Sequence, residues 1–517
     1  MEQKYPGGNR SSWLYAAAAL AILGAVFFFM ARHRLVDVDE GYYLLAAKLV
    51  TEGKTPYIDF FYPQMPLLPY VYGWWMKLFG ASWYSARCLS ALLAIALGAL
   101  VYFHLTKTTG KRSLGFLGAA LFAFSSFSLA WFTVVKTYSL SALLVFLSYL
   151  FLRSSSASPK KYFWGGLFLG LAVDTRLLLA GLVLAAAAQI LWLDKTPGIR
   201  ASRLGWWAFG FLAALSLNGF FLTNPDNFFF NNLGYHLLRS DYGAAETLKL
   251  KLETGLKLFG IGATEPAFAL QFLLLFLAAL FFFRPFSNFA QKPLLGAIFA
   301  ASLLIISFFP TPAYTQYFCV AVPFMIVVLL ESLAGRWKEW FPPQGKKSRP
   351  VWRWGLSAAL FLYLAGGIFD GYRYAFWGER VPGIDLSENA GNWKVEIIRE
   401  ISGLIDAYST RTGEAVISWW PGYFVETEAV PLPGMENNFG LAIASRLTAE
   451  ERRKYRIVSE EEIVREIRQR QVGLVVLDNR LAKLPDFHRR DRLLKEEGFA
   501  LVQAVQSTLL YKRQGEF

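Results

Sequence analysis

Charged residues are scarce in this chain of 517 residues. Only 17% of them are Asp, Glu, Lys or Arg, whereas a soluble protein of this length carries about a quarter. Hydrophobic residues make up 55% of the chain and aromatic residues 17%. Many separate apolar runs are each long enough to span a bilayer, which excludes a single large soluble core. The composition predicts a membrane protein whose solvent is partly hydrocarbon.

Cysteine is also rare. Cys88 and Cys319 lie in or beside apolar runs, with no partner nearby in the sequence and no metal-ligand spacing. This argues against a disulfide framework. The sequence has no Gly-rich phosphate loop, no His-rich metal cluster and no local Ser/His/Asp motif, so none of these common patterns assigns a function.

The formal net charge of +14 follows the positive-inside rule and does not indicate nucleic-acid binding. Lys and Arg cluster in the short segments between alternate apolar runs, most densely over 336–353. Eleven transmembrane helices place all these segments inside, beginning with a retained first helix over 12–31, which has no obvious cleavage site after it. Two long loops, roughly 32–84 and 223–266, then lie outside.

The chain changes character after about residue 370, where it becomes polar and mixed in charge, with no spanning segment. We expect an amphipathic helix over 396–408, short buried strands over 415–419 and 472–477, and a surface helix over 460–470. The sequence thus predicts two domains. These are a transmembrane all-α domain over 1–370 and a soluble α/β domain over 371–517 on the outer side.

The first outer loop holds the residues best suited to chemistry. Asp37, Asp39 and Glu40 follow directly on the first helix. Three carboxylates at a membrane boundary are costly to hold there without a function. The structural alternative is a solvated helix cap, because Asp at a helix start binds free backbone N–H groups.

The same loop continues as an aromatic and proline-rich segment, followed by an apolar stretch that ends at Phe79. This stretch is short for a span and predicts a helix lying in the interface. A carboxylate loop held over the membrane by interfacial helices forms a cavity where lipid-borne and water-borne substrates can meet. Its candidate binding residues are Asp59, Tyr62 and Gln64.

Several features of residues 37–90 occur together. They are an Asp-Glu pair after the first helix, a nearby aromatic residue, a further Asp, a Pro-x-x-Pro-Leu-Leu segment and Arg87 opening the next helix. This combination resembles the membrane glycosyltransferases of the GT-C fold, over roughly residues 12–370. The most similar families are the dolichyl- or undecaprenyl-phosphate-mannose protein mannosyltransferases and the lipid A aminoarabinose transferases (glycosyltransferase families 39 and 83). The chain departs from them at Gln64 and Met65, where relatives often carry a basic residue or His.

The resemblance implies a GT-C membrane fold and inverting transfer of a sugar, mannose-like, from a polyprenyl-phosphate carrier. In these families an Asp of the first pair is the general base, which corresponds to Asp39, with Glu40 beside it. The implied partners are the polyprenyl-phosphate-linked sugar, an acceptor protein, lipid or glycan, and the bilayer of the cytoplasmic (plasma) membrane, with no nucleic acid. The sequence requires no cofactor. A divalent metal ion near Asp39 is compatible with the three carboxylates.

Cations and polar groups near the outer helix ends are candidates for holding the donor phosphate: Arg87, Arg176, His236, Arg239, Gln316 and Tyr317. His236 and Arg239 are three residues apart and share a helical face, although an interfacial helix with snorkelling cations has the same pattern. Gln316 and Tyr317 begin an inward-running helix, where an interfacial aromatic belt is the alternative. We predict that Arg87, His236, Arg239 and Tyr317 converge on one cavity.

Two other functions fit parts of the sequence. A transporter or flippase of a lipid-linked or amphipathic solute needs ionisable or Gly/Pro-broken segments deep within its helices. In this chain the polar residues are concentrated in the outer loops instead. A scaffold whose tail binds cell-wall components would leave the carboxylates of the first loop unexplained.

The one-sided distribution of Lys and Arg gives a direct test of the topology. A reporter that is active only in the cytoplasm should be silent when it is fused at Phe517, because parity places the tail outside. The same reporter fused within 336–353 should be active. A bright signal from the fusion at Phe517 would overturn the helix count.

Overall fold

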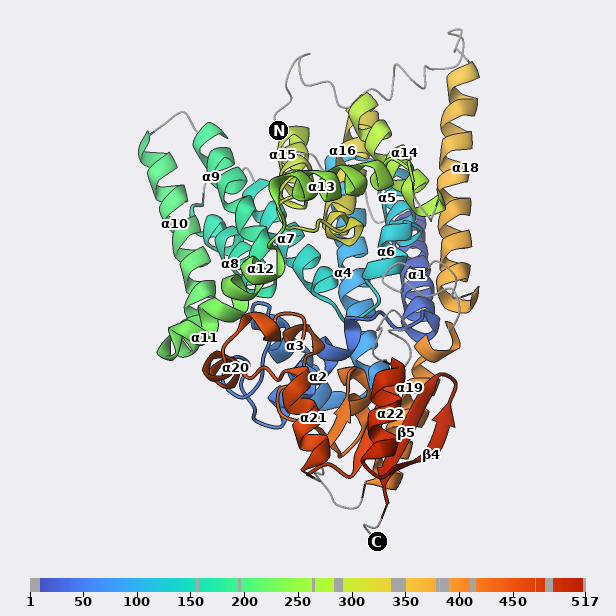
Figure 1. The fold of residues 1–517 in the computed structure, drawn as a ribbon. Coiled ribbons are helices and arrows are strands. Elements are labelled where there is room, and N and C mark those ends of the chain that lie inside the picture. Colours follow the sequence, from blue (N-terminus) through green and yellow to red (C-terminus); the bar gives the residue numbers. More distant parts are fainter. Residues whose placement is uncertain are drawn as a thin grey trace.

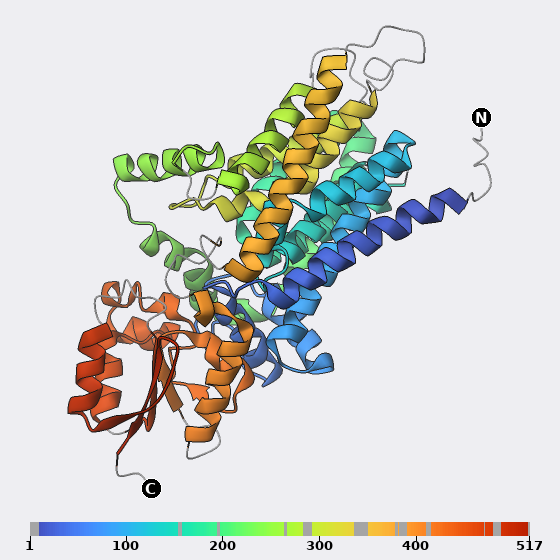
Figure 2. The ribbon, with the colours of Figure 1, turned by 90° about the vertical axis from the view of Figure 1, so that its right-hand side faces the viewer.

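The chain was studied as a computed structural model, which describes residues 10–153, 158–193, 197–262, 266–282, 292–335, 350–377, 381, 390–409, 415–469, 471–478 and 487–514. A helical bundle occupies one end of the molecule and a small α/β domain the other (Figure 1). Figure 2 shows α1 (Arg10–His33) running along the bundle toward this domain. The basic segment 336–349 and the N-terminal Lys4 lie outside the described residues.

The apolar runs of the sequence form the helices of the bundle. After α1 these are α4 (Trp83–Thr109), α5 (Arg112–Ala123), α7 (Thr137–Arg153), α8 (Lys160–Thr175), α9 (Leu182–Leu193), α10 (Pro197–Leu215), α14 (Pro266–Phe282), α15 (Lys292–Ile306), α16 (Val322–Gly335) and α18 (Pro350–Tyr372).

Within the described residues, five helical segments are long and apolar enough to cross a bilayer: Trp13–His33, Trp83–Thr109, Pro197–Thr223, Thr315–Gly335 and Trp354–Trp377. Further apolar helices of 10–17 residues lie between them. The chain is therefore a membrane protein, and the number of eleven spans stays a prediction. The boundary predicted at residue 370 falls inside α18, which ends at Tyr372 and is followed by a π-helical turn to Trp377.

Glycines allow α8 and α10 to pack closely. A Cβ atom added at Gly166 would lie 1.9 Å from the carbonyl oxygen of Trp207, and one at Gly210 would lie 2.0 Å from that of Phe163. Such small residues let helix backbones approach each other where the hydrophobic effect gives no drive for association. This contact positions the end of α8, which precedes Arg176.

Short helices line the end of the bundle that faces the α/β domain. They are α2 (Glu40–Thr51), α3 (Leu67–Phe79), α6 (Ser126–Trp131), α11 (Pro225–Phe229), a π-helical turn η3 (Phe230–Gly234) and α12 (Tyr235–Arg239). The stretch predicted as an interfacial helix is α3, which has 13 residues and exposes Trp74, Leu78 and Phe79. Farther along the chain, α13 (Ala244–Leu258) projects sideways from the bundle (Figure 2).

The C-terminal domain is built on a five-stranded sheet of order β2-β1-β3-β5-β4. Its strands are β1 (Ala415–Ser418), β2 (Val430–Pro431), β3 (Leu474–Asp478), β4 (Phe499–Val505) and β5 (Thr508–Arg513). Strands β1, β2 and β3 pair in parallel, and β5 is antiparallel to both β3 and β4. Its helices are α19 (Val395–Tyr408), α20 (Ala449–Tyr455), α21 (Glu460–Arg468) and α22 (Phe487–Glu496).

The sequence predicted β1, β3, α19 and α21 at nearly these positions, but it missed β4 and β5. The reason lies in burial. Every residue of β3 is buried, which gives a continuous apolar run. The sequence of β4 is also apolar, but β4 lies at the edge of the sheet, where its residues between the two ends are exposed or half-buried. Its place in the sheet depends on antiparallel pairing with β5 and not on burial.

The C-terminal domain packs directly against α2. A Cβ atom on Gly41 would lie 2.7 Å from the Cα of Gly422, so the two backbones touch. The Lys48 ammonium donates to the carbonyl oxygen of Phe424 at 2.8 Å. The Trp420 indole donates to the carbonyl oxygen of Val38 at 2.9 Å. The soluble domain therefore helps to hold the loop that carries the carboxylates.

Glu436 gives a test of how this domain is packed. Burial raises the pKa of Glu436 to about 7, against the lowering effect of its own and Gly434's backbone N–H groups. The folded protein therefore keeps this carboxyl protonated at pH values where the unfolded chain ionises it. The contribution of this carboxyl to the free energy of unfolding is fully present below its ordinary pKa of 4.5, where both states are protonated. It is lost as the pH rises through about 7, because the buried carboxyl must then ionise.

We expect Glu436→Gln to leave the melting temperature nearly unchanged at about pH 5 and to raise it at about pH 8. At the higher pH the free energy of unfolding should increase by up to about 3 kcal/mol. Thermal unfolding of the detergent-solubilised protein across this range measures the effect. Glu428→Gln, at an exposed glutamate, is the matched control. Parallel pH profiles for wild type and Glu436→Gln would show that Glu436 does not titrate in this range.

Candidate active site

The acidic loop between α1 and α2 folds as a tight turn. The Asp37 carboxylate accepts the Asp39 N–H at 2.9 Å, and the Glu40 N–H donates to the Asp37 carbonyl oxygen at 3.0 Å. Asp39 occupies the N-cap position of α2, but its side chain makes no capping hydrogen bond. Asp37 therefore stabilises the turn, and the cap alternative does not account for the Asp39 carboxylate.

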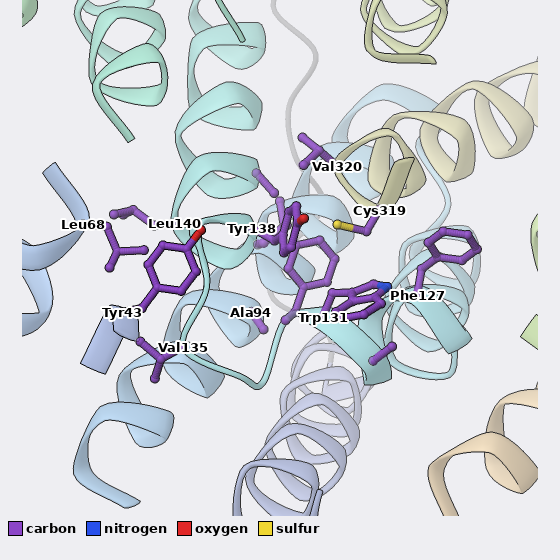
Figure 3. Close-up of a cluster of buried hydrophobic side chains, with 14 of the residues drawn as sticks. Tyr43, Leu68, Ala94, Phe127, Trp131, Val135, Tyr138, Leu140, Cys319 and Val320 are labelled. Atoms are coloured by element: carbon purple, nitrogen blue, oxygen red, sulfur yellow. The ribbon is translucent and has the colours of Figure 1, made fainter. Parts of the chain in front are cut away.

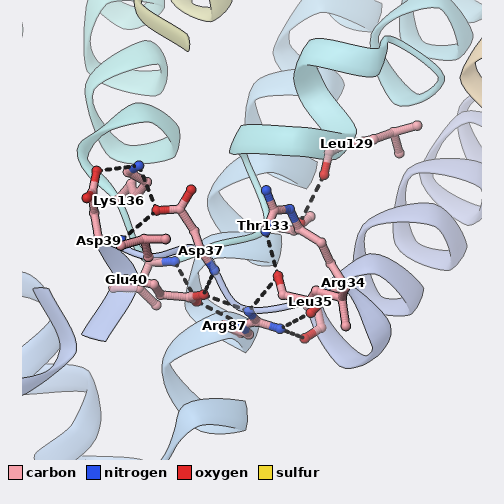
Figure 4. Close-up of polar contacts among 12 residues, drawn as sticks. Arg34, Leu35, Asp37, Asp39, Glu40, Arg87, Leu129, Thr133 and Lys136 are labelled. Atoms are coloured by element: carbon pink, nitrogen blue, oxygen red, sulfur yellow. Dashed lines mark hydrogen bonds and ion pairs between the residues drawn. The ribbon is translucent and has the colours of Figure 1, made fainter. Parts of the chain in front are cut away.

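Glu40 and Arg87 form a buried, bidentate ion pair (Figure 4). The two guanidinium–carboxylate contacts measure 2.7 and 2.6 Å, and both side chains are 0% exposed. Glu40 also accepts the N–H of Val135 at 3.0 Å, while Arg87 donates to the carbonyl oxygen of Arg34 at 2.6 Å. Both side chains are buried against each other and position the loop. Their catalytic and phosphate-binding roles stay predictions.

Asp39 differs from its two acidic neighbours in being partly exposed, with 27% of its side chain accessible. Its Oδ2 atom lies 2.8 Å from the Lys136 ammonium, which is also 2.8 Å from Asp37 Oδ1. Lys136 makes a third contact, to the side-chain oxygen of Gln316 at 3.0 Å. Burial disfavours the lysine charge, but Asp37 and Asp39 raise the pKa of Lys136 well above its ordinary value.

Sequence reasoning missed Lys136 as a site residue. It lies between α6 and α7, in a turn that the predicted topology places on the outer side. The positive-inside rule makes a lysine unusual in an outer turn, and this exception could have marked Lys136 as a candidate site residue. Its ammonium lies 5.2 Å from the centre of the Trp131 ring. Trp131 belongs with Tyr43, Val135 and Tyr138 to one cluster of buried hydrophobic side chains (Figure 3).

Two arginines converge on one pair of tyrosines beside this ammonium. The guanidinium of Arg176, after α8, lies 4.4 Å from the ring centre of Tyr317. Arg239, on α12, donates to the Tyr314 hydroxyl at 3.2 Å. The rings of Tyr314 and Tyr317 are 5.6 Å apart. Gln316, in the 3₁₀ helix η4 (Thr315–Ala321), links this cluster to Lys136 and thereby to Asp39.

Phe439 of the C-terminal domain closes over one side of the cluster. Its ring lies 5.6 Å from the Arg239 guanidinium and 4.8 Å from the Tyr42 ring. Nothing in the local sequence around Phe439 signalled this contact, because it joins residues 200 positions apart.

Of the residues predicted from the sequence, Asp39, Arg176, Arg239, Gln316 and Tyr317 are linked through these contacts, while Arg87 is held apart by Glu40. Of the other four candidates, Asp59, Tyr62 and His236 make hydrogen bonds within the surrounding loops.

His236 contacts the carbonyl oxygen of Pro63 at 3.1 Å, and burial lowers its pKa to about 4, so it is a neutral ring near pH 7. Tyr62 is fully buried and its N–H donates to Asn231 at 2.9 Å. The exposed Asp59 accepts the Thr55 N–H at 2.7 Å within a turn, and Gln64 is half-buried.

A model of the dolichyl-phosphate-mannose-protein mannosyltransferase family matches residues 63–219. The crystal structure of ArnT from Cupriavidus metallidurans bound to undecaprenyl phosphate superimposes with a TM-score of 0.64 at 12% identity, covering 98% of this chain and 99% of that one. The apo ArnT structure gives 0.62 at 14% identity, with 97% and 98% covered. Arabinofuranosyltransferase AftD from mycobacteria gives 0.50 at 14% identity, with 98% and 42% covered. No curated protein sequence matches the chain.

At such low identities the likeness establishes the fold. The chain has the GT-C fold, and the resemblance predicted from the residues of the first loop is confirmed. Full-length coverage in both directions also shows that the soluble domain is part of the ArnT-like architecture.

The Glu40–Arg87 pair generates a stability prediction. Removing one partner of a buried ion pair leaves an uncompensated charge and costs about 3–5 kcal/mol, whereas replacing both partners by apolar residues often costs little. We expect Glu40→Met and Arg87→Met each to lower the melting temperature strongly, and the double variant to recover most of the loss. Lys454→Met, which breaks an exposed pair with Asp226, should change it little. Additive losses in the double variant would contradict this role.

Proposed function

We propose that this chain is an integral membrane glycosyltransferase that moves a sugar from a polyprenyl-phosphate carrier to an acceptor hydroxyl. The observation that carries the proposal is the juxtaposition of a partly exposed carboxylate, Asp39, with two half-buried arginines, Arg176 and Arg239. The ArnT structure with undecaprenyl phosphate, which has the same fold, supports a lipid-phosphate donor. The positive-inside pattern supports a site on the outer face of the cytoplasmic membrane.

In the proposed reaction the acceptor oxygen attacks the anomeric carbon of the donor sugar and loses its proton to Asp39. The bond between the anomeric carbon and the phosphate oxygen breaks, and the carrier leaves as a phosphate monoester with one more negative charge. Displacement from the opposite face inverts the anomeric centre. No general acid is required, because the phosphate is already a good leaving group.

The arginines suit the departing phosphate. Each guanidinium lies against tyrosine rings, at 4.4 Å for Arg176 on Tyr317 and 6.0 Å for Arg239 on Tyr314. A guanidinium carries five N–H donors. Arg176 gives one to the Thr137 hydroxyl at 3.4 Å and Arg239 gives one to the Tyr314 hydroxyl at 3.2 Å, so each arginine has further donors for phosphate oxygens. Donors fixed before the reaction stabilise the charge that develops as the carrier leaves.

The soluble domain, residues 371–517, is proposed to shape the acceptor side of the site, where the Phe439 ring lies 4.8 Å from the Tyr42 ring. It supplies none of the groups assigned to the reaction itself. A protein, lipid or glycan acceptor is compatible with this arrangement. The family-model match makes polyprenyl-phosphate mannose the first donor to test.

Asp39→Asn tests the proposal, because it keeps the shape of the side chain and removes the base. We expect sugar transfer by the purified protein to fall about a hundredfold to ten-thousandfold. Binding of the lipid donor should survive, since the arginines remain. Asp226→Asn, at an exposed carboxylate on α11, is the matched control and should transfer at the wild-type rate.

Arg239→Ala should show the opposite pattern, with donor binding weakened and the Asp39 base intact. Near-normal turnover of a well-folded Asp39→Asn would remove Asp39 as the base. If wild-type protein in vesicles moves a polyprenyl-phosphate sugar between leaflets and cleaves none of the donors tested, the chain is a transporter.

A further inference from the structure

Lys136 occupies the space between two carboxylates that a cation would otherwise bridge. Its ammonium contacts Asp37 Oδ1 and Asp39 Oδ2, each at 2.8 Å (Figure 4). It also contacts the Gln316 side-chain oxygen at 3.0 Å. The three hydrogen atoms of an ammonium group match three acceptors. The lysine side chain is only 3% exposed, so solvent does not compete for these contacts.

The same oxygens would be the ligands of a divalent ion near Asp39. Mg²⁺ requires about six oxygen ligands at about 2.0–2.1 Å, and here the facing carboxylate oxygens are already bound to the ammonium. Glu40, the third acidic residue of the loop, is committed to Arg87. Throughout the described part of the chain, no group of three His, Cys, Asp or Glu side chains is arranged to hold a metal ion.

One buried carboxylate oxygen is a possible ligand for a metal ion. Asp37 Oδ2 is buried and has no hydrogen-bond partner. However, Asp37 feels the positive charges of both Lys136 and the buried Arg34. A divalent ion at this oxygen would sit beside an ammonium group in a medium of low dielectric constant, where like charges repel strongly. The residues of the acidic loop therefore do not fit a divalent ion while Lys136 is in place.

We propose that Lys136 is a positioning residue that replaces a divalent metal ion, binding Asp37 and Asp39 together and fixing the Asp39 carboxylate. If the chain has the proposed function, the consequence is that sugar transfer does not require a divalent metal ion. With Oδ2 held by Lys136, Asp39 Oδ1 is the atom left to accept the proton of the acceptor. Because the Lys136 ammonium is part of the protein, it is already in position before the substrates bind.

The first test does not depend on activity. Purified wild-type protein should contain no stoichiometric divalent metal, and its melting temperature should not change with EDTA or with millimolar Mg²⁺, Mn²⁺ or Zn²⁺. Lys136→Ala should melt at a lower temperature in EDTA, because two carboxylates then face each other without a cation. Divalent metal should raise the melting temperature of this variant alone. A saturable metal-induced rise in the wild type, abolished in Asp39→Asn, would overturn the proposal.

The second test uses transfer and separates positioning from folding. Wild-type transfer should be the same in EDTA and in added metal. We expect Lys136→Ala to lose about a hundredfold in rate and to regain at least tenfold with small alkylammonium ions or divalent metal, neither of which changes the wild type. Lys136→Arg should retain more activity than Lys136→Ala. The control is Lys77→Ala, at an exposed lysine of α3, which should behave as the wild type throughout.

The two experiments give different results if the role of Lys136 is wrong and if the glycosyltransferase function is wrong. Wild-type transfer that EDTA abolishes and metal restores confirms a glycosyltransferase and refutes the role of Lys136. If the wild type transfers no sugar but only Lys136→Ala responds to metal in the melting experiment, Lys136 fills a cation position in a protein of another function. If Lys136→Ala does not fold, metal-independent melting and transfer of the wild type support the proposal, and dependence of either on metal refutes it.

Discussion

The buried Glu40–Arg87 ion pair is the interaction on which the rest of the site depends. It joins the first residue of α2 to α4, and through Val135 and Arg34 it also ties in the segment before α7 and the end of α1. Taking two charges out of water costs several kcal/mol per ion unless geometry and additional hydrogen bonds offset it. Here both guanidinium–carboxylate contacts are short, and backbone groups satisfy the remaining positions. The pair fixes where α2 begins, and Asp39 is the residue immediately before it.

The three carboxylates of the loop have different tasks because their surroundings differ. Glu40 is neutralised by an arginine with fixed geometry. Asp37 holds the turn and shares the ammonium of Lys136. Asp39 is also held by Lys136 but is partly exposed, with 27% of its side chain accessible. Three acidic residues within four positions of the chain thus differ in burial and in partners, and these differences are what the proposed roles rest on.

The soluble domain takes part in this organisation. Trp420 donates to the carbonyl oxygen between Asp37 and Asp39 in the chain, and its ring stacks on Trp83 at the start of α4 at a centroid distance of 5.9 Å. Gly41 and Gly422 permit backbone contact where a methyl group would not fit. Removing the domain would therefore expose α2 and loosen the acidic loop. The two domains named from the sequence behave as one structural unit at the site.

The sequence by itself determined the membrane character and the GT-C resemblance, and it located α1 of the bundle and α19, α21, β1 and β3 of the soluble domain, because apolar run length and residue type are local properties. It assigned the base to Asp39 and not to Glu40 only through the family resemblance, because the two are neighbours with the same charge and the sequence does not show their surroundings. It could not find Lys136, which lies 97 positions beyond Asp39. Only the tertiary structure decided these points, because it alone determines which carboxylate is enclosed by an arginine, which remains partly exposed, and which cation lies between them.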